Sequence, residues 1–207
     1  MNMPFKTALA TALLVTGAQA LAASSVDLTV KGLITPSACT PVLSNGGSVE
    51  YGKISAKDLL PDRPTPLAEQ TVQLAVSCDA ATLMALDADD NRAGSNYGDD
   101  TMEFGLGLIN GTEKLGAMTV KMISPIADGV AVRTIGSVDG GTTWFYERNL
   151  MPDNLISVAD PAVDAPIPVQ ALAADLVVHP SIAPTSQLTL TNEAAIDGSV
   201  TVTVRYL

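Results

Sequence analysis

Two cysteines, Cys39 and Cys78, are the side chains of this chain most able to form a covalent bond with each other. In an exported chain, two cysteines most simply form one disulfide. Their spacing does not match CxxC redox chemistry, and a single histidine is available to join them as metal ligands. Two free thiols are the remaining alternative.

Acid–base chemistry would have to use His179, the one histidine of the chain. Because Pro180 follows it, His179 is expected in a loop or at a strand end and not in a catalytic triad. Carboxylates are plentiful, but their sequence positions bring no pair together. We therefore predict that the protein is not an enzyme and binds no cofactor.

The acidic stretch from Asp87 to Asp100 is the best candidate for a metal site. Asp87, Asp89 and Asn91 imitate the alternating oxygen ligands of a calcium loop. The pattern fails at two strict positions, since Arg92 replaces the turn glycine and a glycine replaces the bidentate glutamate. The stretch is predicted to be a solvated loop without metal.

The charge of the chain limits its partners. It has 22 acidic and 11 basic residues, a net charge of −11, and no stripe of basic residues. Nucleic-acid binding is therefore not expected. The acidity is interpreted as a means of keeping an exported protein in solution.

Residues 1–22 have the pattern of a secretory signal peptide. Lys6 precedes the apolar run 8–15, and small residues then form two possible cleavage sites, after Ala22 or, second, after Ala20. The run is shorter than the ~20 residues that span a bilayer, and no later window is apolar enough to do so. We expect an exported protein without membrane insertion.

These candidate residues need a scaffold, and strand periodicity predicts one. The chain ends in Gly198–Leu207, where alternation places four apolar side chains on one face: Val200, Val202, Val204 and Tyr206. With no later segment to cover this face or pair with this strand, we expect its edge to be open to a partner. A second alternating strand near the N-terminus carries Val26, Leu28, Val30 and Ile34 on one face, with Gly32 as the missing side chain.

Other strands are expected between these two, separated by Gly, Pro, Asn and Asp turns. Asn110-Gly111 is a strong hairpin signal. The stretch Ala171 to Val177 is expected to be a strand, with a helical turn as the alternative. Together the pattern predicts an all-β antiparallel sandwich, whose other strands are expected around Val49 and Tyr51, at 72–78, from Leu83, and at 104–108, 115–123, 130–135, 143–146, 168–178 and 187–191.

Taken together, several motifs make the chain resemble the subunits of chaperone–usher fimbriae. They are the segment 28–34, the pair Ala38-Cys39, the segment 51–54, Cys78 closing a strand, and the end Gly198–Leu207 with its penultimate tyrosine. The segments 90–95 and 104–107 resemble the beta-fimbrial branch, a domain family of unknown function. The stretch near Pro152 to Pro168 exceeds the usual pilin length and is interpreted as a surface loop or an extra hairpin.

The resemblance implies an immunoglobulin-like sandwich that lacks its last strand. A periplasmic chaperone, acting with an outer-membrane usher, would fill the gap before the N-terminal extension of the next pilin subunit does so. Residues 23–35 would be the donor strand, carrying Val26, Leu28, Val30 and Ile34, with Gly32 where the groove has no room. The acceptor domain would be 36–207, with a groove at Gly198, Val200, Val202, Val204 and Tyr206.

The sequence leaves two alternatives open. The strand 26–34 could pair within its own chain and complete the sandwich. The protein would then be a self-contained exported domain that binds carbohydrate or a host surface. An exported hydrolase is the other hypothesis, which has no catalytic set to support it.

Overall fold

A computed structural model describes Thr29 and residues 38–207. The chain divides into two units, Met1–Ile34 and Thr35–Leu207, and the sheets and the core belong to the second unit. The predicted signal peptide and the donor residues Val26, Leu28, Val30, Gly32 and Ile34 lie outside the described residues.

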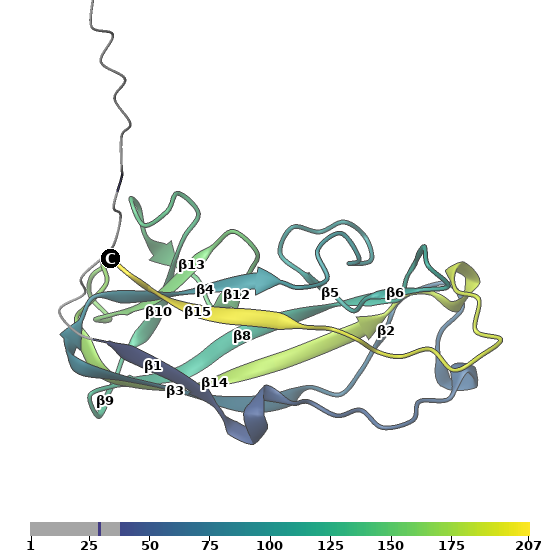
Figure 1. The fold of residues 1–207 in the computed structure, drawn as a ribbon, viewed down its shortest axis with the longest axis horizontal. Helices are drawn as coiled ribbons and strands as arrows, with labels where there is room; N and C mark the ends of the chain where they lie inside the picture. The colour runs from purple at the N-terminus through teal and green to yellow at the C-terminus, as the bar shows by residue number, and fades with distance from the viewer. Residues whose placement is uncertain (1–28, 30–37) are drawn as a thin grey trace, which may run out of the picture. The chain divides into compact units, whose positions relative to one another are not determined.

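The first sheet is antiparallel and contains the two longest strands. Its order is β1 (Cys39–Leu43), β3 (Gln70–Thr82), β14 (Val169–Ile182), β8 (Gly116–Ala127) and β12 (Asn149–Leu150). Three two-residue strands extend its margins: β2 (Thr65–Pro66) on β14, and β5 (Phe104–Gly105) and β9 (Val130–Ala131) on β8. The strand β1 is thus an edge of this sheet (Figure 1).

The second sheet has the order β11 (Phe145–Tyr146), β10 (Arg133–Ser137), β13 (Leu155–Ala159), β4 (Met84–Asp90) and β15 (Val200–Tyr206). A separate hairpin joins β6 (Leu108–Ile109) to β7 (Glu113–Lys114). Helical structure in the described residues is limited to three 3-10 turns, Ser44–Gly47, Ala56–Asp58 and Thr185–Gln187. The strand β15 is therefore an edge of the second sheet, as β1 is of the first.

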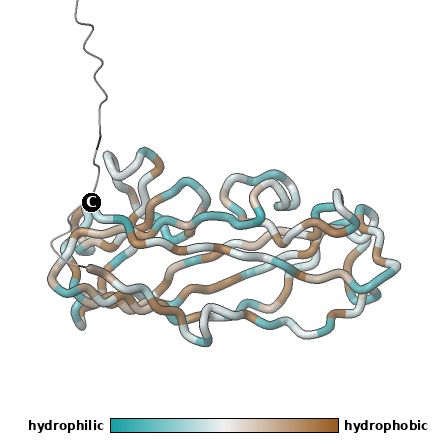
Figure 2. The backbone as a smooth tube through the Cα atoms, viewed as in Figure 1, coloured by the Kyte–Doolittle hydropathy of each residue, from teal (hydrophilic) through white to brown (hydrophobic). Residues whose placement is uncertain are grey.

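One apolar core joins the two sheets. The chain crosses between them at Leu83, the single residue between β3 and β4. Alternating side chains of β3, Val72, Leu74 and Val76, are at most 5% exposed, as period-2 geometry requires for a strand with one covered face. Figure 2 shows hydrophobic stretches along the strands and hydrophilic residues mainly in the connecting loops. The structure thus confirms the predicted all-β antiparallel sandwich.

Several local predictions are confirmed. Cys39 and Cys78 form a disulfide, and they are directly opposite each other in the β1–β3 register. Asn110 and Gly111 both have positive φ, 51° and 84°, the conformation that an Asn-Gly hairpin turn uses. The segment from Ala171 to Val177 is strand, not a helical turn.

The prediction for Pro152 to Pro168 was wrong. This stretch contains β13, a central strand of the second sheet, between β10 and β4. All five of its residues are buried. Because both faces of β13 are covered, it has no polar alternation that would distinguish a sheet strand from a surface loop or an added hairpin.

Other boundaries also need correction. The strand β4 continues to Asp90, so Asp87 and Asp89 lie in a strand, and the predicted loop begins at Asn91. His179 lies inside β14, opposite Thr119 of β8, and not at a strand end. No strand forms around Val49 and Tyr51 or at 187–191.

Candidate functional site

The predicted acceptor residues lie together on the edge strand β15. This strand pairs with β4 from Val200, opposite Asp90, to Tyr206, opposite Met84. Val200, Val202 and Val204 pack against the core but are only half-buried, and Tyr206 is 37% exposed. Compared with Leu74 of β3, which is 1% exposed, this apolar face is incompletely covered by the described residues.

Gly198 precedes β15 at a position where a side chain would collide with the core. A Cβ built there would lie 2.9 Å from Cδ2 of Leu106 and 3.2 Å from Cε of Met118. The segment therefore lies close against the core, and another residue at this position would require the side-chain ends of Leu106 and Met118 to shift. Its neighbour Asp197 is also fixed, since its backbone N–H donates to the carbonyl of Leu106 at 3.1 Å.

The edge strand β1 forms the opposite border. Its one strand partner in the described structure is β3, and its end is tied to β3 by the disulfide Cys39–Cys78. Pro41, which cannot donate a backbone hydrogen bond, is tolerated in β1 because an edge strand needs pairing on one side alone. Leu43 packs half-buried against the core.

The two borders approach each other at two places and run in opposite directions. At one end, the backbone N–H of Cys39 donates to the hydroxyl of Tyr206 at 2.9 Å. At the other, Nζ of Lys53 pairs with Oε1 of Glu193 at 2.7 Å, with both side chains almost fully exposed. In Figure 1, β15 with the segment before it and β1 with the segment after it both extend along the horizontal axis of the view.

An open cleft of about 640 Å³ lies at the end marked by Lys53 and Glu193. Its walls are residues 49–54 and 192–196, which continue from β1 and lead into β15. Apolar side chains at Leu115, Ile182 and Leu190 form its lining toward the core. We call it the edge cleft; it could not be recognised from sequence because its two walls are segments far apart in the chain.

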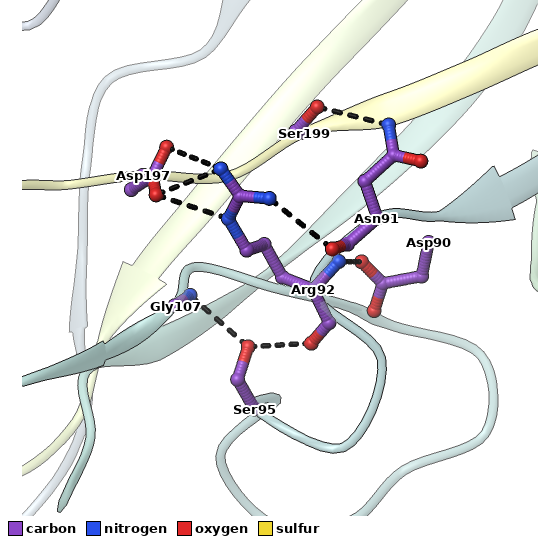
Figure 3. A network of polar contacts seen from close by, with 7 residues as sticks. All are labelled: Asp90, Asn91, Arg92, Ser95, Gly107, Asp197 and Ser199. Carbon is purple, nitrogen blue, oxygen red and sulfur yellow. Dashed lines mark hydrogen bonds and ion pairs between the residues drawn. The ribbon is translucent and has the colours of Figure 1, made fainter. Parts of the chain in front are cut away.

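A polar network fixes the entry to β15, as Figure 3 shows. Arg92 donates from Nε and Nη2 to the two carboxylate oxygens of Asp197, at 3.0 and 2.9 Å. Next to it, Nδ2 of Asn91 donates to the hydroxyls of Ser199 and Thr201, each at 3.0 Å. These contacts join the end of β4 to the start of β15 and hold their register.

The turn after β4, which carries Asn91 and Arg92, is held in place by further hydrogen bonds. Asp90 accepts from the backbone N–H of Arg92 at 2.8 Å and from that of Gly105 at 2.9 Å. The hydroxyl of Ser95 donates to the carbonyl of Arg92 at 2.6 Å and accepts from the N–H of Gly107 at 3.1 Å. Arg92, which stands where a calcium loop would need its turn glycine, thus secures an edge strand.

Replacing Arg92 by glutamine is expected to loosen residues 192–199 without unfolding the sandwich. Arginine is favoured here because its planar fork matches the carboxylate, so Arg92→Lys should restore only part of the order. The measurement is hydrogen exchange of the Asp197 and Asn91 amides, which should become several-fold faster in Arg92→Gln. Arg63→Gln, at an exposed loop position, is the control; equal exchange in both variants would contradict the assignment.

The ion pair between Arg92 and Asp197 also makes the effect of Arg92→Gln depend on pH. Hydrogen bonding and charge from Arg92 lower the pKa of Asp197 below its ordinary value. The stabilisation that this ion pair gives to the folded state is therefore complete above the ordinary carboxyl pKa. It is lost as the pH falls through the lowered pKa of Asp197. The difference between wild type and Arg92→Gln should accordingly disappear in strong acid.

The other predicted chemical residues do not assemble into a site. Nδ1 of His179 lies 3.6 Å from a carboxylate oxygen of Glu69, and Asp87 pairs with Arg205 at 3.2 Å. Across residues 38–207, no three His, Cys, Asp or Glu side chains are grouped so that they could hold a metal ion. No helix in the same range is long and apolar enough to cross a membrane.

Comparisons with known proteins give two relatives that each match more than nine-tenths of this chain. Protein GltF of Escherichia coli (strain K12) is 27% identical over an alignment of 244 residues, gaps included, which covers 97% of this chain and 96% of that protein. The uncharacterized protein YhcF of the same organism is 26% identical over 223 residues, covering 91% and 93%. Residues 28–103, which include the disulfide, β4 and the turn at Arg92, match the family described as a protein of unknown function, DUF1120.

Proposed function

We propose that this protein is a structural subunit that assembles head-to-tail by strand addition at a cell surface. The observation that carries the proposal is the open border between the sheets. Two edge strands, β1 and β15, flank half-buried apolar side chains, and the border continues into the edge cleft. An edge of this kind is a template for a further strand.

Residues 23–35 have the chemistry to be that strand. Val26, Leu28, Val30 and Ile34 alternate as side chains that insert between two sheets must. Extended, the segment spans roughly 40 Å, which suits β15 together with the segment that leads into it. Main-chain hydrogen bonds to β15 would supply affinity, and the alternating side chains would cover Val200, Val202 and Val204.

Donation to a neighbouring copy produces a filament. The donor segment and the acceptor border are different surfaces, so each contact is heterologous and need not close into a ring. Before assembly, the same border would leave apolar side chains exposed, and a strand from a periplasmic chaperone would cover it, with an outer-membrane usher directing exchange. The proposed role is structural and needs no catalytic residue or cofactor.

Removing residues 23–35 tests the proposal. We expect the shortened chain to accept a strand but to donate none, because its β15 border is intact. Surface material should be run on a denaturing gel unheated and heated: wild type should give a ladder of multiples that collapses on heating, and the shortened chain alone should give none. Co-expressed with wild type, it should shorten the ladder as its share rises.

The control is the full-length chain, which retains residues 23–35, expressed at the same level. A ladder from the shortened chain alone would overturn the proposal. A single heat-insensitive monomer band from wild type would favour the closed sandwich, in which residues 26–34 pair within their own chain.

A further inference from the structure

A second cleft, separate from the edge cleft, is rich in carboxylates. It has a volume of about 670 Å³ and lies where β4 ends and β13 begins, between residues 93–103 and the turn 151–154. Its lining includes six acidic side chains: Asp90, Asp99, Asp100, Glu103, Glu147 and Asp153. We call it the acidic cleft.

Four of these six carboxylates already have partners. Asp90 accepts two backbone N–H groups, Asp99 pairs with Lys114, and Asp100 accepts from the N–H of Met102. Glu147 accepts three hydrogen bonds from the adjacent residues 148 and 149. These interactions account for the local folding of the walls.

The carboxylates of Glu103 and Asp153 have no partners of this kind. No side chain or backbone group in residues 38–207 donates to either carboxylate, and no cation there pairs with them. Burial, with a smaller contribution from the charge of Asp100, raises the pKa of Glu103 above its ordinary value. A half-buried carboxylate of this kind would gain from a positively charged partner.

Asn154 gives an independent indication of a ligand. It lines the same cleft, is 2% exposed, and neither its Oδ1 nor its Nδ2 has a hydrogen-bond partner in the described structure. Folded proteins rarely leave a buried amide unpaired, because its lost hydration is not replaced. The amide is sealed from solvent, so a ligand would reach it by a shift of the turn 151–154.

The remaining lining sets the shape of the ligand. Met102, Val138, Met151 and Pro152 add apolar surface beside the free carboxylates. The acids are too dispersed for three to hold one metal ion. A cation carried on an apolar stem suits this combination, since the stem can lie on apolar surface while its head meets a carboxylate.

We propose that the acidic cleft binds a guanidinium or primary ammonium group on an aliphatic stem, with Glu103 and Asp153 pairing the cation and the amide of Asn154 completing its hydrogen bonds. Such a group occurs in free amines and in arginine or lysine side chains of a polypeptide. The site does not depend on strand addition, since the proposed ligand-binding residues Glu103, Asp153 and Asn154 lie outside the β1–β15 border.

Calorimetry on the full exported protein tests the site with defined probes. Agmatine represents the free amines, and acetyl-Gly-Arg-Gly-amide represents a polypeptide. The same tripeptide with citrulline in place of arginine is a neutral isostere and should bind about tenfold more weakly or worse, as expected for loss of a charge-assisted hydrogen bond. Binding of agmatine alone would assign free amines, and binding of the arginine peptide alone would assign a polypeptide.

Variants locate the binding. Glu103→Gln and Asp153→Asn should each weaken it about tenfold, and asparagine tolerates the positive φ of 60° at position 153. Asp62→Asn, at an exposed position outside the cleft, should bind as wild type. Asn154→Leu should bind more weakly and yet unfold at a higher temperature, because it removes an unpaired buried amide.

The proposal fails if wild type binds neither cationic probe, or if citrulline binds as well as arginine. It also fails if Glu103→Gln and Asp153→Asn bind unchanged. Calcium binding that Glu103→Gln abolishes, without binding of either organic cation, would replace the proposed ligand by a metal ion. Each result can be obtained with or without filament assembly, so failure here leaves the proposed function standing.

Discussion

Replacing Cys39 and Cys78 together by alanine is expected to lower the free energy of unfolding by about 4 kcal/mol. The disulfide closes a loop across 39 positions of sequence separation, and loss of that closure enlarges the unfolded ensemble. Such a loss is a large share of the total free energy of unfolding, which is roughly 5–15 kcal/mol for a typical domain. Urea denaturation, followed by the fluorescence of Trp144, measures it.

The same change should damage strand acceptance more than the rest of the fold. The strand β1 pairs with β3 and with no other strand of the described structure, and the bridge fixes its end beside Tyr206. Without the bridge, the β1 border can separate from β3 before the central strands unfold. Thr40→Ala, at an exposed position of β1, is the control. Equal urea midpoints for Thr40→Ala and for the variant without both cysteines would contradict the expected loss of stability.

Val202→Lys is expected to abolish strand acceptance, so that the ladder on an unheated gel is lost. Val202 lies half-buried in the middle of β15 and packs against the core beside the open border. A charged, longer side chain there would compete for the space of an incoming strand and would be costly to bury beneath it. The folded sandwich should persist, because an unoccupied border leaves the lysine a path to solvent.

Thr203→Lys is the matched control for this substitution. Thr203 is the next residue of β15, faces the exposed side, and lies opposite Asp87 of β4. The two variants therefore add the same charge to the same strand on opposite faces. If both variants formed ladders, or both lost them, β15 would not present its apolar face to a donor strand.

The elements that could be predicted from sequence are those whose pattern has one physical interpretation. β15 alternates valine with polar residues, so its two faces follow from strand geometry alone. The turn at Asn110 and Gly111 follows from the low cost of positive φ at these residue types. The disulfide follows from a pair of cysteines with no third cysteine to compete for either.

One strand, and the end of another, could not be recognised from local pattern because their environment is made by distant segments. β13 is covered on both faces, and its one polar side chain, Ser157, is satisfied by donating to the carbonyl of Met84 at 2.6 Å. β14 continues through the buried Pro180 to Ile182, although proline usually marks the end of a strand. Sheet packing outweighed the local signal in both cases.

The candidate sites divide in the same way. Sequence by itself determined the covalent link between Cys39 and Cys78, the apolar face of β15 and the alternating segment 26–34, because each depends on residue type and period. Tertiary structure alone decided that β1 is an edge strand beside β15, that Arg92 holds Asp197, and that Glu103 and Asn154 share a cleft. Those relations join residues far apart in the chain, and their geometry is set by how two sheets pack, which no local spacing encodes.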